Sequence, residues 1–267
     1  MKKKIYFWLI AIVLTLVASV YQRVTGPTYP FKLDVTIEGQ DYTFHLPRSG
    51  GERNKEVLLP DVPPTVKAVL HWRCYPSSEG YQSVPFTVKG GVLQAALPQQ
   101  PRAGKLAYYL TINGKDYRQE VPLLIRFKGD VEAKVLIPHI FFLFLAMLIA
   151  CYTLLQVISG DKHYRKPLWI ATLFVVIGGF IFGPIVQYEA FGAYWTGIPY
   201  GYDLTDNKTL IAGIFLLAAS FTTRYRWNRY LTMLAVVVLF AIFTIPHSLY
   251  GSQLNRDTGQ VQVGRSK

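Results

Sequence analysis

Long apolar segments are the feature that most restricts how this chain of 267 residues can fold. Residues 135–158 and 168–186 contain no Asp, Glu, Lys or Arg. A helix needs roughly 20 apolar residues to cross a hydrocarbon core about 30 Å thick. Charged residues make up only 16% of the chain, against about a quarter in an average soluble protein, so a wholly soluble fold is excluded. We predict four transmembrane helices, at about 135–158, 168–187, 204–223 and 230–247.

A further apolar segment, residues 5–21, follows Lys2, Lys3 and Lys4. Its basic start and the small residues Ala18 and Ser19 also fit a cleavable secretory signal. The long apolar run favours an uncleaved transmembrane anchor over residues 1–22. In both cases the residues that follow are placed outside the cytoplasm.

The basic residues predict how the spans are oriented. Nine of them lie at the N-terminus and in two short loops, on one side of the membrane if the spans alternate: Lys2, Lys3, Lys4, Lys162, Arg165, Lys166, Arg224, Arg226 and Arg229. The loop 187–209 has one base. Basic loops stay in the cytoplasm, so we predict a multi-pass protein of a bacterial inner membrane, with a cytoplasmic N-terminus and a periplasmic β domain and C-terminus.

The same distribution explains the net charge of +12. Residues 22–134 hold 15 bases and 11 acids, a net charge of only +4. The basic excess therefore reflects membrane topology, and no nucleic acid is expected as a partner.

Residues 23–132 have the pattern of an all-β domain. Residues 31–38 alternate between apolar and polar side chains, as a half-buried strand does. Asn113-Gly114 is a pair typical of a tight hairpin turn. Seven to nine short strands in about 100 residues predict a sandwich of immunoglobulin or fibronectin-III type. The expected fold is thus an anchor, a β-sandwich (23–132), a four-helix membrane bundle (133–250) and a polar periplasmic tail (251–267).

Catalytic signatures are absent from the sequence: it has no nucleotide-binding loop and no zinc-protease, serine-hydrolase or CxxC motif. No ionised residue lies near the middle of a predicted span, which argues against an ion-coupled transporter. Gly179 and Gly183 form a GxxxG pattern that predicts close helix packing. In the β domain, His45, His71 and Arg73 are interpreted as exposed surface residues.

Two histidines occupy similar positions in the predicted bundle. His139 follows Pro138 near the start of one span, and His247 follows Pro246 at the end of another. Both imidazoles are expected near the periplasmic surface, where they form one hypothetical site for haem or a divalent metal. Candidate additional metal ligands on that side are Glu189, Asp203 and Asp206. The alternative is that each histidine is an interfacial residue at a helix end.

The loop before the third predicted transmembrane helix is rich in aromatic residues. They are Tyr188, Phe191, Tyr194, Trp195, Tyr200 and Tyr202. Two interpretations remain open: an aromatic belt at the membrane interface, or a folded lid or ligand-binding loop over the bundle. Asp203 is predicted as a helix N-cap, with Asp206 in the first turn near the positive end of the helix dipole. Lys208 is expected to extend outward or to pair with a carboxylate.

Together these patterns favour a non-enzymatic function. The leading hypothesis is a subunit, scaffold or assembly factor that contacts the lipid bilayer and binds a protein partner in the membrane or periplasm through its β domain. The alternative is a haem- or metal-binding redox protein with a site near the periplasmic face. A channel or transporter component is a third hypothesis, and it requires a polar pathway that these helices supply only if they oligomerise.

Overall fold

The computed structural model describes residues 2–246, 253–256, 258, 259, 261 and 262. These residues divide into two compact units, each described here by itself. The helical unit contains residues 2–26 and 131–246. The β unit contains residues 27–130 and the described residues between 253 and 262.

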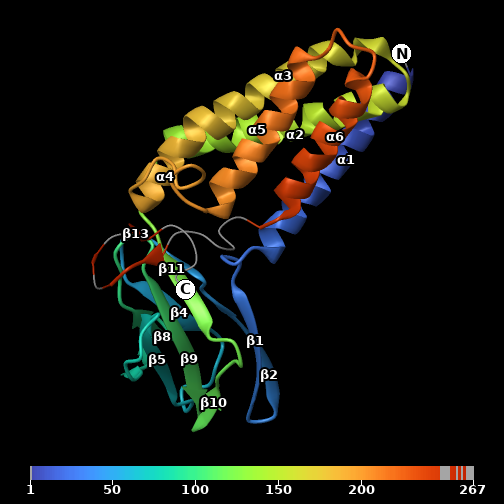
Figure 1. Cartoon of the computed structure of the whole chain (residues 1–267). Helices are drawn as coiled ribbons and strands as arrows, with labels where there is room; N and C mark the ends of the chain where they lie inside the picture. Colours follow the sequence, from blue (N-terminus) through green and yellow to red (C-terminus); the bar gives the residue numbers. More distant parts are fainter. Residues whose placement is uncertain (1, 247–252, 257, 260, 263–267) are drawn as a thin grey trace. The chain divides into compact units, whose positions relative to one another are not determined.

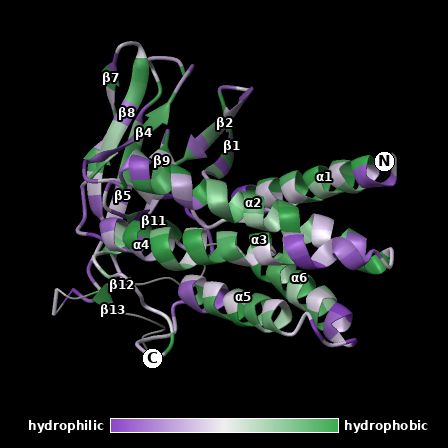
Figure 2. Ribbon diagram, turned by 90° about the horizontal axis from the view of Figure 1, so that it is seen from above, coloured by the Kyte–Doolittle hydropathy of each residue, from purple (hydrophilic) through white to green (hydrophobic). Residues whose placement is uncertain are grey.

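Within the described residues, the helical unit is built from eight helical segments (Figure 1). They are α1 (Lys2–Thr25), α2 (Ala133–Ile158), η1 (Lys162–Tyr164), α3 (Arg165–Val175), the π-helix η2 (Val176–Phe182), α4 (Gly183–Phe191), α5 (Leu204–Phe221) and α6 (Asn228–Thr244). Helices Lys3–Thr25, Ala133–Ile158, Lys162–Phe191 and Leu204–Phe221 are long and apolar enough to cross a membrane, and α6 is a shorter apolar helix. Figure 2 shows apolar residues along these helices and hydrophilic residues where α3 begins and where α5 joins α6. The apolar helices indicate contact with a lipid bilayer.

The span predicted at 168–187 is longer than expected. It runs through 30 residues, Lys162–Phe191, because η1, α3, η2 and α4 follow one another without a break. The π-helical turn in its middle is a rare element that often marks a functional site.

Small residues bring the helices of this unit close together. A Cβ atom added at Gly213 of α5 would lie 2.6 Å from the ring of Phe180, and one at Gly179 would lie 2.7 Å from a methyl carbon of Thr209. Alanines fill much of the buried core, at positions 146, 150, 171, 212, 219 and 235. Gly179 and Gly213 thus mark a close approach of η2 to α5, as small residues do between membrane helices, whereas Gly183, the second glycine of the GxxxG pattern, faces His139 of α2.

The β unit contains several open sheets. Its strands are β1 (Phe31–Ile37), β2 (Gln40–Leu46), β3 (Ser49–Gly50), β4 (Lys55–Leu59), β5 (Ala68–Tyr75), β6 (Gln82–Pro85), β7 (Thr87–Lys89), β8 (Val92–Leu97), β9 (Lys105–Ile112), β10 (Lys115–Tyr117), β11 (Leu123–Phe127), β12 (Gln253–Leu254) and β13 (Val261–Gln262). The largest sheet has the order β3-β11-β9-β5-β6, with β10 also paired to β9. The pairs β1-β2 and β12-β13 and the triplet β4-β8-β7 form the other sheets.

One hydrophobic core joins these sheets. Buried side chains from β1, β2, β4, β5, β8, β9 and β11 pack in a single cluster that includes Phe44, Leu59, Leu70, Tyr108 and Phe127. In β1 every second side chain is buried, which confirms the alternation predicted over residues 31–38. Strands β3 and β4 were not predicted, although Val57 and Leu59 of β4 alternate into the core.

The tail adds strands that the sequence did not predict. The Leu254 amide donates a hydrogen bond to the Ala103 carbonyl (3.2 Å), and Lys105 Nζ donates to Gln253 Oε1 (3.2 Å). Leu254 is buried in the β unit. The described tail residues are therefore part of the packed β unit.

Candidate functional site

A buried carboxylate fixes the loop between α4 and α5. Asp206 Oδ2 accepts hydrogen bonds from the backbone amides of Thr196 (2.5 Å) and Gly197 (3.1 Å) and from the Thr196 hydroxyl (3.0 Å). It also accepts one from Gln187 Nε2 of α4, at 2.9 Å. Gly197 leaves room for this arrangement, because a Cβ there would lie 2.7 Å from both Asp206 Cβ and Asn207 Oδ1. The loop is consequently folded onto the start of α5.

Two neighbouring charged residues have structural partners as well. Asp203 is the N-cap of α5, as predicted, and accepts from the Thr205 amide at 2.8 Å. Lys208 neither extends outward nor pairs with a carboxylate in the bonds observed. It is buried and donates to the backbone carbonyls of Ile245 (2.7 Å) and Pro246 (3.5 Å), just after α6. A cation satisfies these carbonyls because the C-terminal end of a helix is partially negative.

The aromatic residues of this segment include two stacked ring pairs, although Tyr188 and Tyr194 are exposed. The rings of Tyr188 and Tyr194 stack at 4.3 Å, and Trp195 stacks on Phe180 of η2 at 6.0 Å. Phe191, at the end of α4, is half-buried. Tyr200 and Tyr202 are about four-fifths exposed. Both interpretations of this loop, an interfacial belt and a ligand-binding lid, stay predictions.

The predicted metal ligands that the structure describes are held by other groups. Glu189 Oε2 accepts from the Glu132 amide at the N-cap of α2 (2.8 Å). His139 Nδ1 lies 2.8 Å from the Gly178 carbonyl oxygen. His247 lies outside the described residues. Among the residues that the structure describes, three or more His, Cys, Asp or Glu side chains nowhere gather as a metal site would require.

The His139 contact defines the protonation of its ring. The Gly178 carbonyl can only accept, so Nδ1 of His139 must carry a proton. The same carbonyl also accepts the π-helical bond from the Gly183 amide. In the neutral imidazole, Nε2 then holds the lone pair, which is the arrangement found in metal-ligating histidines.

The β unit presents a second group of candidate functional side chains, which we call the arginine–tyrosine cluster: His71, Arg73, Tyr81, Tyr109 and Arg118. The His71 and Tyr109 rings stack at 4.5 Å, and the guanidinium carbon of Arg118 lies 4.3 Å from the centre of the Tyr109 ring. Tyr81 meets Tyr109 edge-on at 5.0 Å. Arg73 and Arg118 lie 5.0 and 5.1 Å from the Tyr81 ring centre. Stacking of this kind holds two guanidinium groups at defined positions.

Strand register explains how the cluster forms. His71 of β5 is directly opposite Tyr109 of β9. Strands β5 and β10 pair with the same residues of β9, so they flank it on opposite sides. Arg118, which follows β10, therefore reaches Tyr109 from the side opposite His71. Both faces of the Tyr109 ring are covered as a result.

A chain of hydrogen bonds runs across the same face of the sheet. Ser83 Oγ lies 2.8 Å from His71 Nδ1, His71 Nε2 lies 2.8 Å from Thr111 Oγ1, and Thr111 donates to Asp116 Oδ1 at 2.6 Å. Because the Thr111 proton is directed at Asp116, His71 Nε2 must be the donor to Thr111, and Ser83 donates to Nδ1. Partial burial lowers the pKa of His71, while the Asp116 carboxylate opposes that shift. His71 is thus held neutral at neutral pH.

The sequence predicted His71 and Arg73 as exposed surface residues without partners, whereas both are half-buried in the structure. Those partners come from β6, β9, β10 and the loop before β6, so only the strand pairing brings them together. The alternation of β5, which assigns both side chains to one face, was the only signal available.

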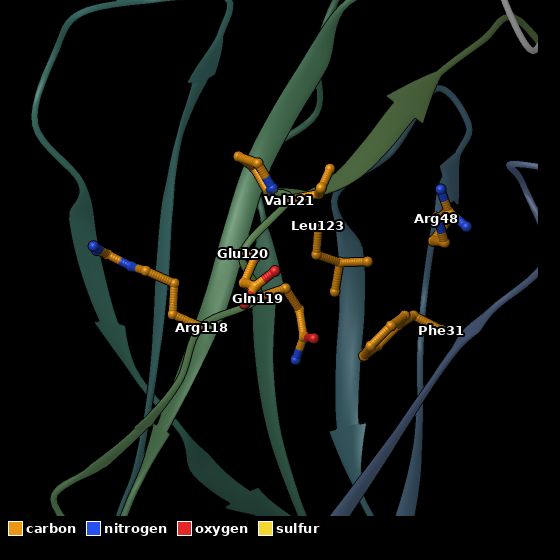
Figure 3. A pocket seen from close by; sticks show the side chains of 8 residues that line it. Phe31, Arg48, Arg118, Gln119, Glu120, Val121 and Leu123 are labelled. Atoms are coloured by element: carbon orange, nitrogen blue, oxygen red, sulfur yellow. The ribbon is translucent and has the colours of Figure 1, made fainter.

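A surface cavity of about 560 Å³ lies on the β unit (Figure 3). Phe31, Arg48, Val121 and Leu123 are among its lining residues, and so is Arg118 of the cluster.

No protein-family model matches the sequence, and comparison with curated proteins and with solved structures finds no match either.

Proposed function

We propose that this chain is a non-catalytic, membrane-anchored binding protein whose β unit contacts a partner protein outside the bilayer, as a subunit, scaffold or assembly factor. The observation that carries this proposal is the arginine–tyrosine cluster. Tyr and Arg are the residue types that most often dominate binding energy in protein interfaces. Here two arginines are ordered on tyrosine rings before any partner arrives, which reduces the entropy lost on binding.

Site-specific photo-crosslinking in native membranes tests this function. A photoreactive amino acid at Ser83, which is exposed beside His71, is expected to form one discrete protein adduct. The matched control position is Thr43, an exposed residue of β2. Adducts of equal intensity from both positions, or none from Ser83, would contradict the proposal.

We also propose an orientation with a cytoplasmic N-terminus and a periplasmic β unit in a bacterial inner membrane. Lys3 and Lys4 border the same small cavity as Gly160 and Asp161, which supports a shared side for the N-terminus and the turn after α2. The test is labelling of single cysteines by an impermeant maleimide, in a chain whose free Cys74 and Cys151 have been replaced. A cysteine at Tyr202 should be labelled from outside and one at Arg226 only after lysis. If the cysteines at positions 202 and 226 were labelled from the same side of the membrane, the proposed orientation would be wrong.

The fold type is part of the proposal. We propose that the sheets of the β unit form a two-layer sandwich of immunoglobulin or fibronectin-III type. The single core shared by strands of three sheets supports it, and an experimental structure of the β unit would test it.

A second candidate function is a haem- or metal-binding redox protein. The observation that favours it is the His139–Gly178 hydrogen bond, which leaves Nε2 of the neutral ring as a possible ligand. Metal analysis and the Soret spectrum of purified protein test it, with His139→Ala and His247→Ala as variants. A parent protein without bound metal or a Soret band would remove this candidate.

A further inference from the structure

The cavity of Figure 3 and the arginine–tyrosine cluster share Arg118. Arg118 is among the residues that line the cavity, and its side chain in Figure 3 extends away from Phe31 and Leu123. Its guanidinium group lies over the rings of Tyr109 and Tyr81. One residue thus connects a cavity lined by apolar and polar side chains with a pair of guanidinium groups stacked on tyrosine rings.

The cavity combines apolar and basic side chains. Phe31, Val121 and Leu123 supply apolar surface, and Val121 is 79% exposed. Arg48 borders the cavity, with its Nε atom buried and without a hydrogen-bond partner among the described residues. Glu120 is the acidic residue among the described residues of the lining. Beside the cavity Arg48 and Glu120 therefore carry opposite charges, and the positive charge lies on the cluster side, at Arg73 and Arg118.

The covered rings restrict what the cluster can recognise. His71 and Arg118 occupy the two faces of Tyr109, so that ring has no face left on which a sugar or a base could stack. The groups that remain are guanidinium N–H donors, which bind carboxylates in a planar, two-bonded geometry. Arg73 uses one of its donors on the Ser77 carbonyl, at 3.1 Å.

We propose that this surface binds an extended acidic segment of the partner protein. A carboxylate of the segment binds between Arg73 and Arg118, and a neighbouring apolar side chain enters the cavity beside Val121 and Leu123. This inference rests on the proposed binding function of the β unit and names its ligand chemistry. The net charge of +4 over residues 22–134 is too small to favour a polyanion such as nucleic acid.

Fluorescence anisotropy with the purified full-length chain in detergent tests the inference. The probes are three labelled pentapeptides: Glu-Glu-Leu-Glu-Glu, the same peptide with Ala for Leu, and Lys-Lys-Leu-Lys-Lys. We expect the acidic leucine peptide to bind at least tenfold more tightly than the lysine peptide, and more tightly than the alanine peptide. Arg118→Glu should weaken acidic binding at least tenfold. Val121→Asp should abolish the difference in affinity between the acidic leucine peptide and the acidic alanine peptide.

The matched control is Lys89→Glu, which reverses an exposed charge on β7, outside the cluster and the cavity. The inference would be overturned if acidic and basic peptides bound with equal affinity. It would also be overturned if Lys89→Glu and Arg118→Glu lowered the affinity for the acidic leucine peptide equally. Binding to phosphatidylserine vesicles in preference to the acidic peptides would also overturn it. A Ser83 crosslink that persists without acidic-peptide binding would leave the proposed function standing and reject only this ligand chemistry.

Discussion

Single polar residues fix the irregular parts of this molecule, and Asp206 is the clearest case. Its Oδ2 atom accepts from two backbone amides of the preceding loop and from side chains of Gln187 and Thr196. The sequence predicted a carboxylate near the start of a helix. It did not predict that the partners would come from the loop, because they depend on how the loop folds back.

Asp206→Ala should therefore release the loop between α4 and α5. The variant leaves buried amides of Thr196 and Gly197 unsatisfied, at a cost of about 1–3 kcal/mol for each group. We expect a lower melting temperature in detergent and new proteolytic cleavage near Tyr200. Asp203→Ala, which removes the helix cap and leaves the four hydrogen bonds of Asp206 Oδ2 in place, is the comparison, and loss of the cap should cost about 1 kcal/mol. Unchanged proteolysis of the Asp206 variant would contradict this role.

His71 predicts how the stability of the β unit depends on pH. Burial lowers its pKa below the ordinary value of 6.5, so the unfolded state takes up the proton first as the pH falls. The contribution of neutral His71 to the free energy of unfolding is complete above about pH 6.5 and declines as the solution becomes more acidic. Thermal unfolding measured by calorimetry from pH 7.5 to 5 should show this decline.

The control for that titration is His71→Gln, which has no group that ionises in this range. The difference in unfolding free energy between parent and variant should change between pH 7.5 and 5. Parallel pH profiles would show that His71 contributes nothing to the dependence.

At the scale of elements, patterns of burial were easier to predict than contacts. The alternation in β1 and the apolar runs of α2 and α5 follow from which faces meet a core or lipid, and these appear in the sequence as simple periods. Strand β4 was not predicted from the sequence because it begins with the charged residues Lys55 and Glu56, and within the strand only Val57 and Leu59 are buried. The π-helical turn has no period of its own, so apolar composition could not reveal it.

Gly213→Ala tests the close contact between α5 and η2. The new methyl group would lie 2.6 Å from the Phe180 ring, so that ring or the helix must move. Overpacking of this kind costs about 1–3 kcal/mol. A thermal melt in detergent should show the loss, whereas Ile214→Ala, at a position 55% exposed, should have a smaller effect. Equal effects of the two variants would argue against tight packing here.

At the scale of the whole molecule, the chain returns to its β unit after the last helix. Arg256 donates to the Gln100 side chain (2.9 Å) and to the Lys105 carbonyl (3.0 Å), and Leu254 is buried. Residues more than 140 positions apart thus share one unit. The polar composition of the tail gave no sign of this, since among the tail residues that the structure describes Leu254 is the one buried apolar side chain.

Leu254→Ala should destabilise the β unit by about 2 kcal/mol, the amount expected when a buried leucine is truncated near a surface. Calorimetry of the full-length chain gives the measurement. Val88→Ala is the control, because Val88 is 57% exposed and its truncation removes little buried area. If Leu254→Ala proved as stable as Val88→Ala, the tail would not be part of the folded β unit.

The sequence by itself determined the apolar helices, the β-rich segment between them and the N-cap at Asp203, because each depends on neighbouring residues or on a short period along the chain. Tertiary structure decided the rest. The loop held by Asp206, the His139 bond to a π-helical carbonyl and the arginine–tyrosine cluster all join residues from separate elements. Their geometry depends on strand register and helix packing, which local composition does not encode.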